Sequence, residues 1–152
     1  WYRTKKNIKF LTNARQTEVN FTANIIESSI KESPERFKLG NLSIDKFITN
    51  LKQLRKTSYE RERTILVIDS DRHPIYNQTP LSSNSFYQTM RRKMIEEASK
   101  NGFKVIDMEP IFREDYSRKK IQFDSKYDSH WNEYGHKKVS DAIINEIDKL
   151  YF

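Results

Sequence analysis

Hydrophobic residues recur at helical spacing in four stretches of the chain, and each stretch predicts a helix. The expected helices cover residues 5–31, 43–54, 85–101 and the segment after Asn132. The clearest one-sided stripe, in residues 43–54, consists of Ile44, Phe47, Ile48, Leu51 and Leu54.

The ends of these helices carry their own signals. Ser33-Pro34 should interrupt the first helix, and Gly40-Asn41 is a turn signal. Ser43 should therefore cap the second helix at its start. Ser85 should open the third helix, and Asn101-Gly102 should close it. The buried face of the last helix should comprise Val139, Ala142, Ile143, Ile147 and Leu150.

Two short apolar runs predict buried strands, at residues 64–69 (TILVID) and 103–108 (FKVIDM). The helix between them makes a βαβ unit, in which the two strands run parallel. Strands that are apolar on both faces belong to a parallel sheet with helices on each side. The pattern therefore predicts an α/β fold with a doubly wound parallel sheet.

Two strands do not make a stable parallel sheet. Either the first half of the chain contributes strands that the pattern does not reveal, or the missing strands lie upstream of Trp1. We favour the second explanation, in which the chain is the C-terminal part of a larger α/β domain. Residues 1–42 would then be a helical lead-in, and residues 43–152 the C-terminal part of the domain.

Composition excludes several classes of protein. The chain has no cysteine, which removes disulfides, thiolate metal sites and cysteine nucleophiles. Three glycines are too few and too scattered for a dinucleotide-binding or Walker phosphate loop, so no cofactor is expected. The longest strongly apolar run, Ile65–Ile68, is far shorter than the roughly 20 residues that span a bilayer. Nothing near Trp1 resembles the apolar core of a signal peptide, so the compartment stays open, an extracytoplasmic one included.

The net charge of +7 and the isoelectric point near 9.5 could attract nucleic acid, anionic lipid or acidic polysaccharide. However, the basic residues are spread from Arg3 to Lys149 and are mixed with acidic ones. We therefore favour a solvated basic surface over a dedicated polyanion site, and expect no nucleic-acid partner.

Candidate chemistry is concentrated in residues 124–136 (DSKYDSHWNEYGH), between the last predicted strand and the last helix. Open α/β sheets place their sites at this edge. Asp128 and His130 can lie within about 2.6–3.2 Å, so that the carboxylate accepts the imidazole Nδ1–H. Nε2, facing an open cleft, is then free to take a proton from a nucleophile. The alternative is a helix-entry loop with a surface histidine and an ordinary Asn132 cap.

The string Asp-x-His-Trp-Asn-x-x-Gly-His, followed by an amphipathic helix, resembles the C-terminal catalytic block of SGNH (GDSL-type) hydrolases. It is most similar to the branch with Asp-x-His-Trp, which includes relatives that act on polysaccharide acetyl groups. The order of elements over residues 43–152 is similar too. The resemblance implies a flavodoxin-like, three-layer α/β/α fold.

The resemblance also implies roles for individual residues. His130 would be the general base and Asp128 its orienting carboxylate. Trp131 would pack beside the site, and Asn132 would cap the last helix. Gly135 would let the helix backbone approach the loop. His73 could line a substrate pocket, although a plain loop position is the alternative, and His136 has no catalytic role by this argument. The three histidines show no metal-binding spacing, so no metal site is expected.

The nucleophile is the missing part. The family places it in a Gly-Asp-Ser block and takes further oxyanion donors from a Gly and an Asn, and this sequence has none of these blocks in recognisable form. Asp69-Ser70 follows a strand and imitates the first block, but too few residues separate Ser70 from His130 for the units that the fold needs. The nucleophile is therefore unknown.

The function expected from the resemblance is a serine esterase or O-acyltransferase that acts on an O-acyl ester, with acetyl favoured, of a small molecule or a polysaccharide. This chain would supply the histidine and aspartate of the triad. It would need the upstream part of the same protein, or a partner strand, for the rest. The alternative is a non-catalytic binding or accessory module of the same fold that uses its basic surface.

Overall fold

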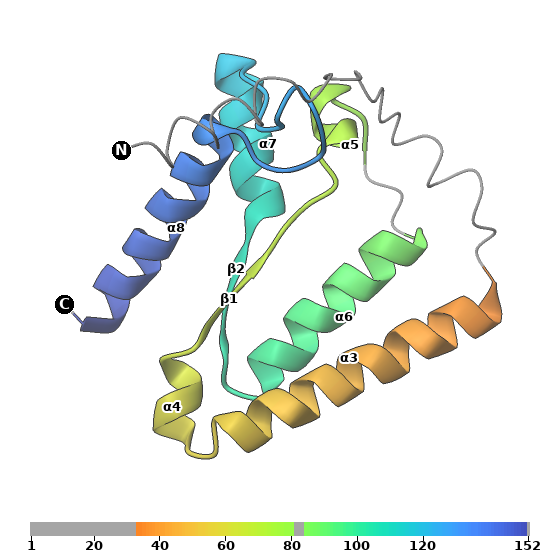
Figure 1. Ribbon diagram of the computed structural model, residues 1–152, viewed down its shortest axis with the longest axis vertical. Helices are drawn as coiled ribbons and strands as arrows, with labels where there is room; N and C mark the ends of the chain where they lie inside the picture. The colour runs from red at the N-terminus through yellow and green to blue at the C-terminus, as the bar shows by residue number, and fades with distance from the viewer. Residues whose placement is uncertain (1–32, 81–83, 152) are drawn as a thin grey trace, which may run out of the picture.

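The computed structural model describes residues 33–80 and 84–151, and the helix expected at residues 5–31 lies outside them. The described elements (Figure 1) are, in chain order, α3 (Pro34–Leu54), α4 (Ser58–Glu62), β1 (Ile65–Ile68), α5 (His73–Tyr76), α6 (Phe86–Lys100), β2 (Lys104–Asp107), α7 (Met108–Lys119) and α8 (Glu133–Tyr151). Within the described residues, no helix combines the length and the apolar character that crossing a membrane requires.

The strands β1 and β2 pair in parallel, as the sequence predicts, with a register that runs from Ile65 opposite Lys104 to Ile68 opposite Asp107. The helix α6 forms the crossover between them and contacts both strands. The described sheet contains these two strands alone, so the second edge of β1 has no described partner. The described part is thus a mixed helix and strand structure with a small parallel sheet, which is compatible with the predicted α/β class.

Hydrophobic clusters cover both faces of the two strands. Leu66 and Val105 pack against the cluster of Ile44, Ile48, Ala98 and Phe103, to which α3 and α6 contribute. Ile65, Val67 and Ile106 belong to the second cluster, with Ile75, Met108, Phe112, Phe123 and Val139. Successive strand residues point to opposite faces, so helices lie on each side of the sheet, and Figure 1 shows α3 with α6 on one side and α8 on the other.

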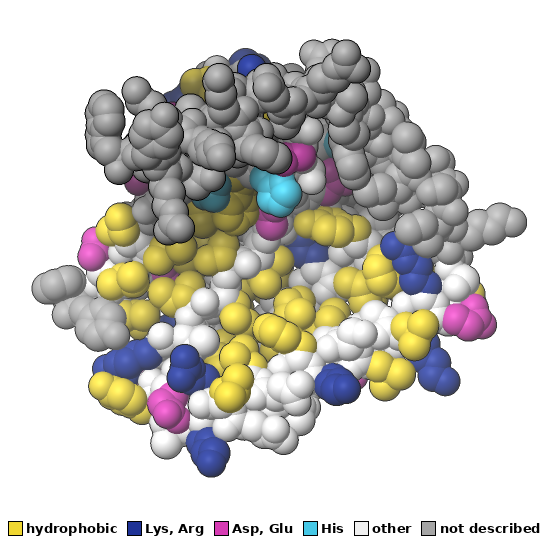
Figure 2. Space-filling model, viewed as in Figure 1, with side chains coloured by type: hydrophobic (Ala, Val, Ile, Leu, Met, Phe, Trp, Pro, Cys, Tyr) yellow, Lys and Arg dark blue, Asp and Glu magenta, His cyan; other side chains and the backbone are white. Residues whose placement is uncertain are grey.

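One surface of the molecule remains strongly apolar. Figure 2 shows hydrophobic side chains spread broadly over the face between α8 and α3, with Lys and Arg side chains mainly along its margin. All four residues of β1 are only partly buried. The basic side chains do not gather into a single patch on this face.

The predicted turn at Gly40-Asn41 is wrong, because α3 runs through it without interruption. Gly40 is needed for packing instead, because a Cβ at this position would collide with Met90 Sδ of α6. The absence of a side chain lets two helices approach closely. The proposed division of the chain between residues 42 and 43 falls inside this helix.

The predicted cap of this helix is also wrong. Ser33 is the N-cap and accepts a hydrogen bond from the Arg36 N–H at 3.2 Å, and Pro34 occupies the first turn. Ser33-Pro34 therefore begins a helix, because proline lacks only an N–H that the first turn does not use. Ser43 lies within the helix, and its hydroxyl donates to the Leu39 carbonyl at 2.9 Å.

Three further helices were not expected from the sequence. The short α4 begins with a capping box between Thr57 and Glu60, and α5 is a single turn after β1. In α7, the side chain of Asp107 accepts from the Glu109 N–H at 2.9 Å, so the helix starts directly at the end of β2. Pro110 is tolerated because it lies in the first turn.

The remaining helix predictions hold with small changes. Ser85 caps α6, and Gly102 follows that helix with a φ of +85°, a conformation that favours glycine. Val139 of α8 is buried and Ala142 and Ile143 pack beside it, as expected. Ile147, which was expected on the buried face, is 39% exposed, so the last turns of α8 are less buried than its middle.

A buried carboxylate links α7 to α8. Asp115 accepts hydrogen bonds from Tyr134, from Lys138 at 2.7 Å and from Lys119 at 3.1 Å. Burial alone would raise the pKa of Asp115, but the hydrogen bonds from Lys138, Tyr134 and Lys119 outweigh it and lower the pKa to about 2. The charged form is therefore the one that the fold stabilises.

We predict that Asp115→Asn reduces the free energy of unfolding at pH 7 by about 2 kcal/mol. Because the pKa is lower in the folded state, this contribution is present above about pH 4 and is lost as the pH falls through about 2. Urea unfolding at pH 7 and between pH 2 and 4 measures it. Asp141→Asn, which removes an exposed pair with Lys137, is the control and should cost about 0.5 kcal/mol or less. Equal acid sensitivity of wild type and Asp115→Asn would contradict the assignment.

Candidate functional site

The loop between α7 and α8 is closed by backbone hydrogen bonds. Asp124 and Trp131 form an antiparallel bridge, and beside it the Ser125 N–H donates to the His130 carbonyl at 2.8 Å. The Trp131 indole Nε1–H donates to the Asp69 carboxylate at 3.2 Å, and Asp69 directly follows β1. The loop therefore lies at the carboxyl end of β1, the edge at which open α/β sheets place their sites.

Asp128 and His130 lie together in this loop, at the predicted distance. His130 Nδ1 is 2.9 Å from Asp128 Oδ2, and the His130 backbone N–H donates to Asp128 Oδ1 at 2.9 Å. Both bonds lower the pKa of Asp128, and the backbone hydrogen bond has the larger effect. The carboxylate is thus held on both oxygens by one neighbouring residue.

This geometry selects one form of the imidazole ring. A carboxylate beside Nδ1 favours the tautomer with the proton on Nδ1, which leaves the lone pair on Nε2. The side chain of His130 is 86% exposed, so Nε2 can reach a solute. The pair can therefore accept a proton and stabilise the resulting imidazolium.

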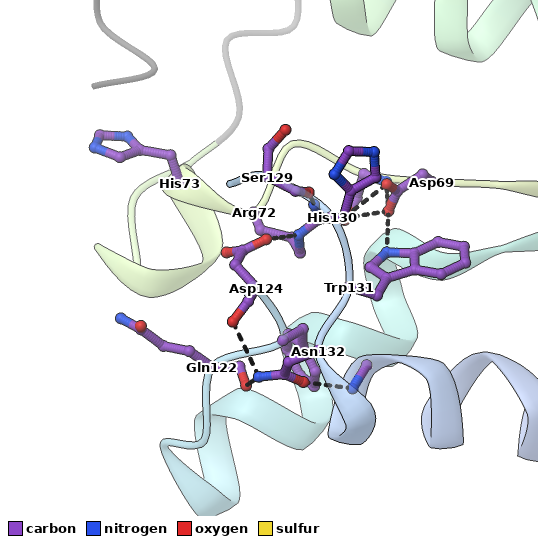
Figure 3. A network of polar contacts seen from close by, with 12 residues as sticks. Asp69, Arg72, His73, Gln122, Asp124, Ser129, His130, Trp131 and Asn132 are labelled. Carbon is purple, nitrogen blue, oxygen red and sulfur yellow. Dashed lines mark hydrogen bonds and ion pairs between the residues drawn. The ribbon is translucent and has the colours of Figure 1, made fainter. Parts of the chain in front are cut away.

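A buried arginine connects this loop to the end of β1. Arg72 is 8% exposed, and its Nη1 donates to both oxygens of Asp69 at 2.7 Å. Its Nε donates to Asp124 and its Nη2 to the Ser129 carbonyl. Figure 3 shows Arg72 between these groups, with His130 and Trp131 on the same side as Asp69. Together with the hydrogen bond from Trp131 to Asp69, this guanidinium group fixes the loop to the end of β1.

The residues expected to support the site lie around the same loop. The Asn132 amide donates to the Gln122 and Asp124 carbonyls at 2.9 and 3.0 Å, and its oxygen accepts from the Gly135 N–H at 2.9 Å, so Asn132 caps α8. A Cβ on Gly135 would lie 2.7 Å from the Phe123 carbonyl oxygen, which explains the glycine. The rings of His136 and Trp131 are perpendicular, with 5.5 Å between their centroids.

His73 and Ser70 are not part of this arrangement. His73 lies on α5, and its exposed ring points away from His130 in Figure 3. Ser70 is 4% exposed, and its hydroxyl has no hydrogen-bond partner among the described residues. A nucleophile needs an accessible oxygen, so this conformation gives Ser70 no catalytic geometry. The pocket role of His73 stays a prediction.

The described cavities lie elsewhere. One of about 710 Å³ is lined by residues at the starts of α3 and α6, among them Ser33, Phe37 and Asn84. Another of about 290 Å³ lies near the ends of the same helices, beside Arg61 and Lys100. Neither includes His130, so a cleft next to Nε2 also stays a prediction. Within the part of the chain that the structure describes, no cluster of metal-ligating side chains is found.

Sequence reasoning missed Arg72, Asp69 and Asp124 as parts of the site. Arg72 is separated from its partners Asp124 and Ser129 by 52 and 57 positions, so no local spacing connects them. The one available signal was Asp69, an acidic residue directly after a buried strand.

Comparisons of the chain with models of protein families, with curated proteins and with solved structures find no match. The resemblance to SGNH hydrolases therefore rests on the loop residues themselves.

We predict that Gly135→Ala lowers the free energy of unfolding by about 1–3 kcal/mol, although alanine favours helices. The new Cβ would press on the Phe123 carbonyl, which is backbone and cannot rotate away. Urea unfolding measures the effect. Ser140→Ala, on the exposed side of α8, is the matched control and should change stability by less than about 0.5 kcal/mol. Equal stabilities of the two variants would show that α8 does not approach residue 123 this closely.

We predict that the neutral ring of His130 carries its proton on Nδ1, and that Asp128→Asn removes this preference. The asparagine side chain offers a neutral oxygen and a competing N–H₂ donor in place of the carboxylate. Nitrogen-15 NMR of the imidazole ring distinguishes the tautomers. Asp141→Asn is the control. An unchanged His130 spectrum in Asp128→Asn would mean that the pair does not form in solution.

Proposed function

We propose that this chain carries the general base and the orienting carboxylate of an SGNH-type ester hydrolase or O-acyltransferase. The observation that carries the proposal is the contact between His130 Nδ1 and Asp128 Oδ2, 2.9 Å long, with the rest of the imidazole open to solvent. The non-local anchoring of the loop at the carboxyl end of β1 supports it.

The chemistry follows from an imidazole held in this tautomer. A serine hydroxyl adds to the ester carbonyl carbon while its proton passes to His130 Nε2, which gives a tetrahedral oxyanion and an imidazolium. Asp128 stabilises the imidazolium through Nδ1–H. When the carbon–oxygen bond to the alkoxy group breaks, that group leaves as an alcohol with the proton from Nε2, and the serine keeps the acyl group.

The second half of the reaction repeats these steps with another acceptor. Water or an alcohol loses a proton to His130 Nε2 as it attacks the acyl-serine, and the serine oxygen then recovers a proton from Nε2. With water the net reaction is hydrolysis, and with an alcohol it is acyl transfer. The proposed substrate is an O-acyl ester of a small molecule or a polysaccharide, and the favoured acyl group is acetyl.

The serine and the oxyanion donors of this proposal come from outside residues 33–80 and 84–151. Ser70, the candidate that imitates the family's first block, has a shielded hydroxyl. The second edge of β1, which has no described partner, is where further strands of an α/β sheet could join. The upstream part of the same protein, or a partner chain, would contribute both.

We predict that the protein expressed from its complete reading frame hydrolyses 4-nitrophenyl acetate and that His130→Ala lowers kcat/KM at least about 10⁴-fold. Asp128→Asn should lower it about 10⁴-fold, because the wrong tautomer then occupies the site. His136→Gln is the matched control and should retain the activity. Activity that survives His130→Ala would refute the role of this histidine, and a protein inactive on acyl esters would favour the non-catalytic module.

Residues 1–152 alone serve as a separate test of where the nucleophile lies. We predict that they give no hydrolysis above the buffer rate. If they do hydrolyse the ester, and His130→Ala abolishes that activity, the nucleophile is a serine of this chain. Ser70→Ala would then be the first variant to measure.

A further inference from the structure

One peptide group carries hydrogen bonds at both of its ends. Between Ser129 and His130, the carbonyl oxygen accepts from Arg72 Nη2, and the N–H of the same peptide donates to Asp128 Oδ1 at 2.9 Å. The other oxygen of Asp128 holds His130 Nδ1 at 2.9 Å. A continuous chain of contacts therefore runs from a buried guanidinium to the proposed catalytic imidazole.

We propose that Arg72 is the positioning residue of the Asp128 and His130 pair and that it acts through the peptide bond between Ser129 and His130. The proposal rests on the proposed function for its catalytic meaning, but its structural claim is independent of activity. Arg72 itself touches neither His130 nor Asp128 in the contacts above, so its role is one of orientation.

The peptide plane is the element that Arg72 controls. A peptide group is rigid and planar, so fixing its carbonyl oxygen also fixes the direction of its N–H. That N–H determines where the Asp128 carboxylate lies, and the carboxylate in turn determines the ring orientation of His130. Hydrogen bonds in such a chain also polarise one another, which makes the N–H a stronger donor to the carboxylate.

The backbone of the loop is held by its own hydrogen bonds, such as that from the Ser125 N–H to the His130 carbonyl, whereas the two side chains of the pair have little support from packing. The side chain of Asp128 is 47% exposed and that of His130 is 86% exposed, so packing constrains them little. Arg72, in contrast, is 8% exposed and is itself held by Asp69 and Asp124. The buried guanidinium therefore connects an exposed loop to the fixed end of β1.

Arginine is required here because its planar group donates in several directions at once. Its Nε, Nη1 and Nη2 bond Asp124, Asp69 and Ser129 respectively. The ammonium group of lysine is a point charge and cannot reach all three partners from one position. Arg72→Lys therefore keeps the positive charge near the carboxylates and releases the Ser129 carbonyl.

The experiment compares Arg72→Lys with Arg91→Lys in the complete protein. Arg91 is equally buried at 8% and bonds Asp107 at the end of β2, but it bonds no residue of the loop 125–130 among the described contacts. The measurements are thermal unfolding, amide hydrogen exchange of the His130 N–H, the nitrogen-15 spectrum of the His130 ring, and kcat and KM on 4-nitrophenyl acetate.

In Arg72→Lys we expect the His130 amide to exchange about tenfold faster, as for the loss of one hydrogen bond to a charged group. The ring of His130 should show a mixture of tautomers, and kcat should fall about 10²-fold with a smaller change in KM. Arg91→Lys should lower thermal stability to a similar degree and leave the His130 signals and kcat unchanged.

The possible results separate the two proposals. Unchanged His130 signals in Arg72→Lys, or equal changes in Arg91→Lys, overturn the positioning role, whether or not the protein is an esterase. Changed signals in a protein without esterase activity support the positioning role and refute the proposed function. If Arg72→Lys does not fold, Asp69→Asn takes its place. This variant weakens the hold on Arg72, so it should shift the same His130 signals in the same direction, and unchanged signals overturn the role.

Discussion

The parallel pairing of β1 and β2 is the constraint on which the rest of the structure depends. Parallel strands cannot be joined by a tight turn, so α6 has to cross back along the sheet. Side chains alternate between the two faces, and Leu66 and Val67 therefore need separate apolar partners. The helices α3 and α6 cover one face, and α7 and α8 help to cover the other. The same direction of both strands brings Asp69 and Asp107 to one edge.

Charge at this edge is organised around a buried cation. Burial of the charged Arg72 side chain without partners would be strongly unfavourable, and Asp69, Asp124 and the Ser129 carbonyl provide these partners. Two of these partners belong to the loop before α8. Burial of one guanidinium group therefore gives an exposed loop a fixed position relative to the sheet. This is how a surface pair such as Asp128 and His130 can be ordered without being buried.

Misread signals in the sequence show how one residue type serves different physical needs. Gly40 indicated a turn, because glycine is common in turns. In the structure it lies where α3 closely approaches Met90 of α6. Ser43 had the chemistry of a cap, yet Ser33 with Pro34 provides the actual start of the helix. The first error arises because the spacing along the chain contains no information about which neighbouring helix comes near. The second is local, because a serine followed by proline can begin a helix as well as interrupt one.

The sequence by itself determined the two strands, the helix between them, the last helix and the contact of Asp128 with His130. Each depends on residues close in the chain, where periodicity, capping residues and a two-residue spacing act directly. Only the tertiary structure decided that α3 is continuous, that Ser70 is shielded and that Arg72 holds the loop. These features depend on residues far apart in the chain, such as Arg72 and Asp124, which meet only after the sheet and its helices have packed.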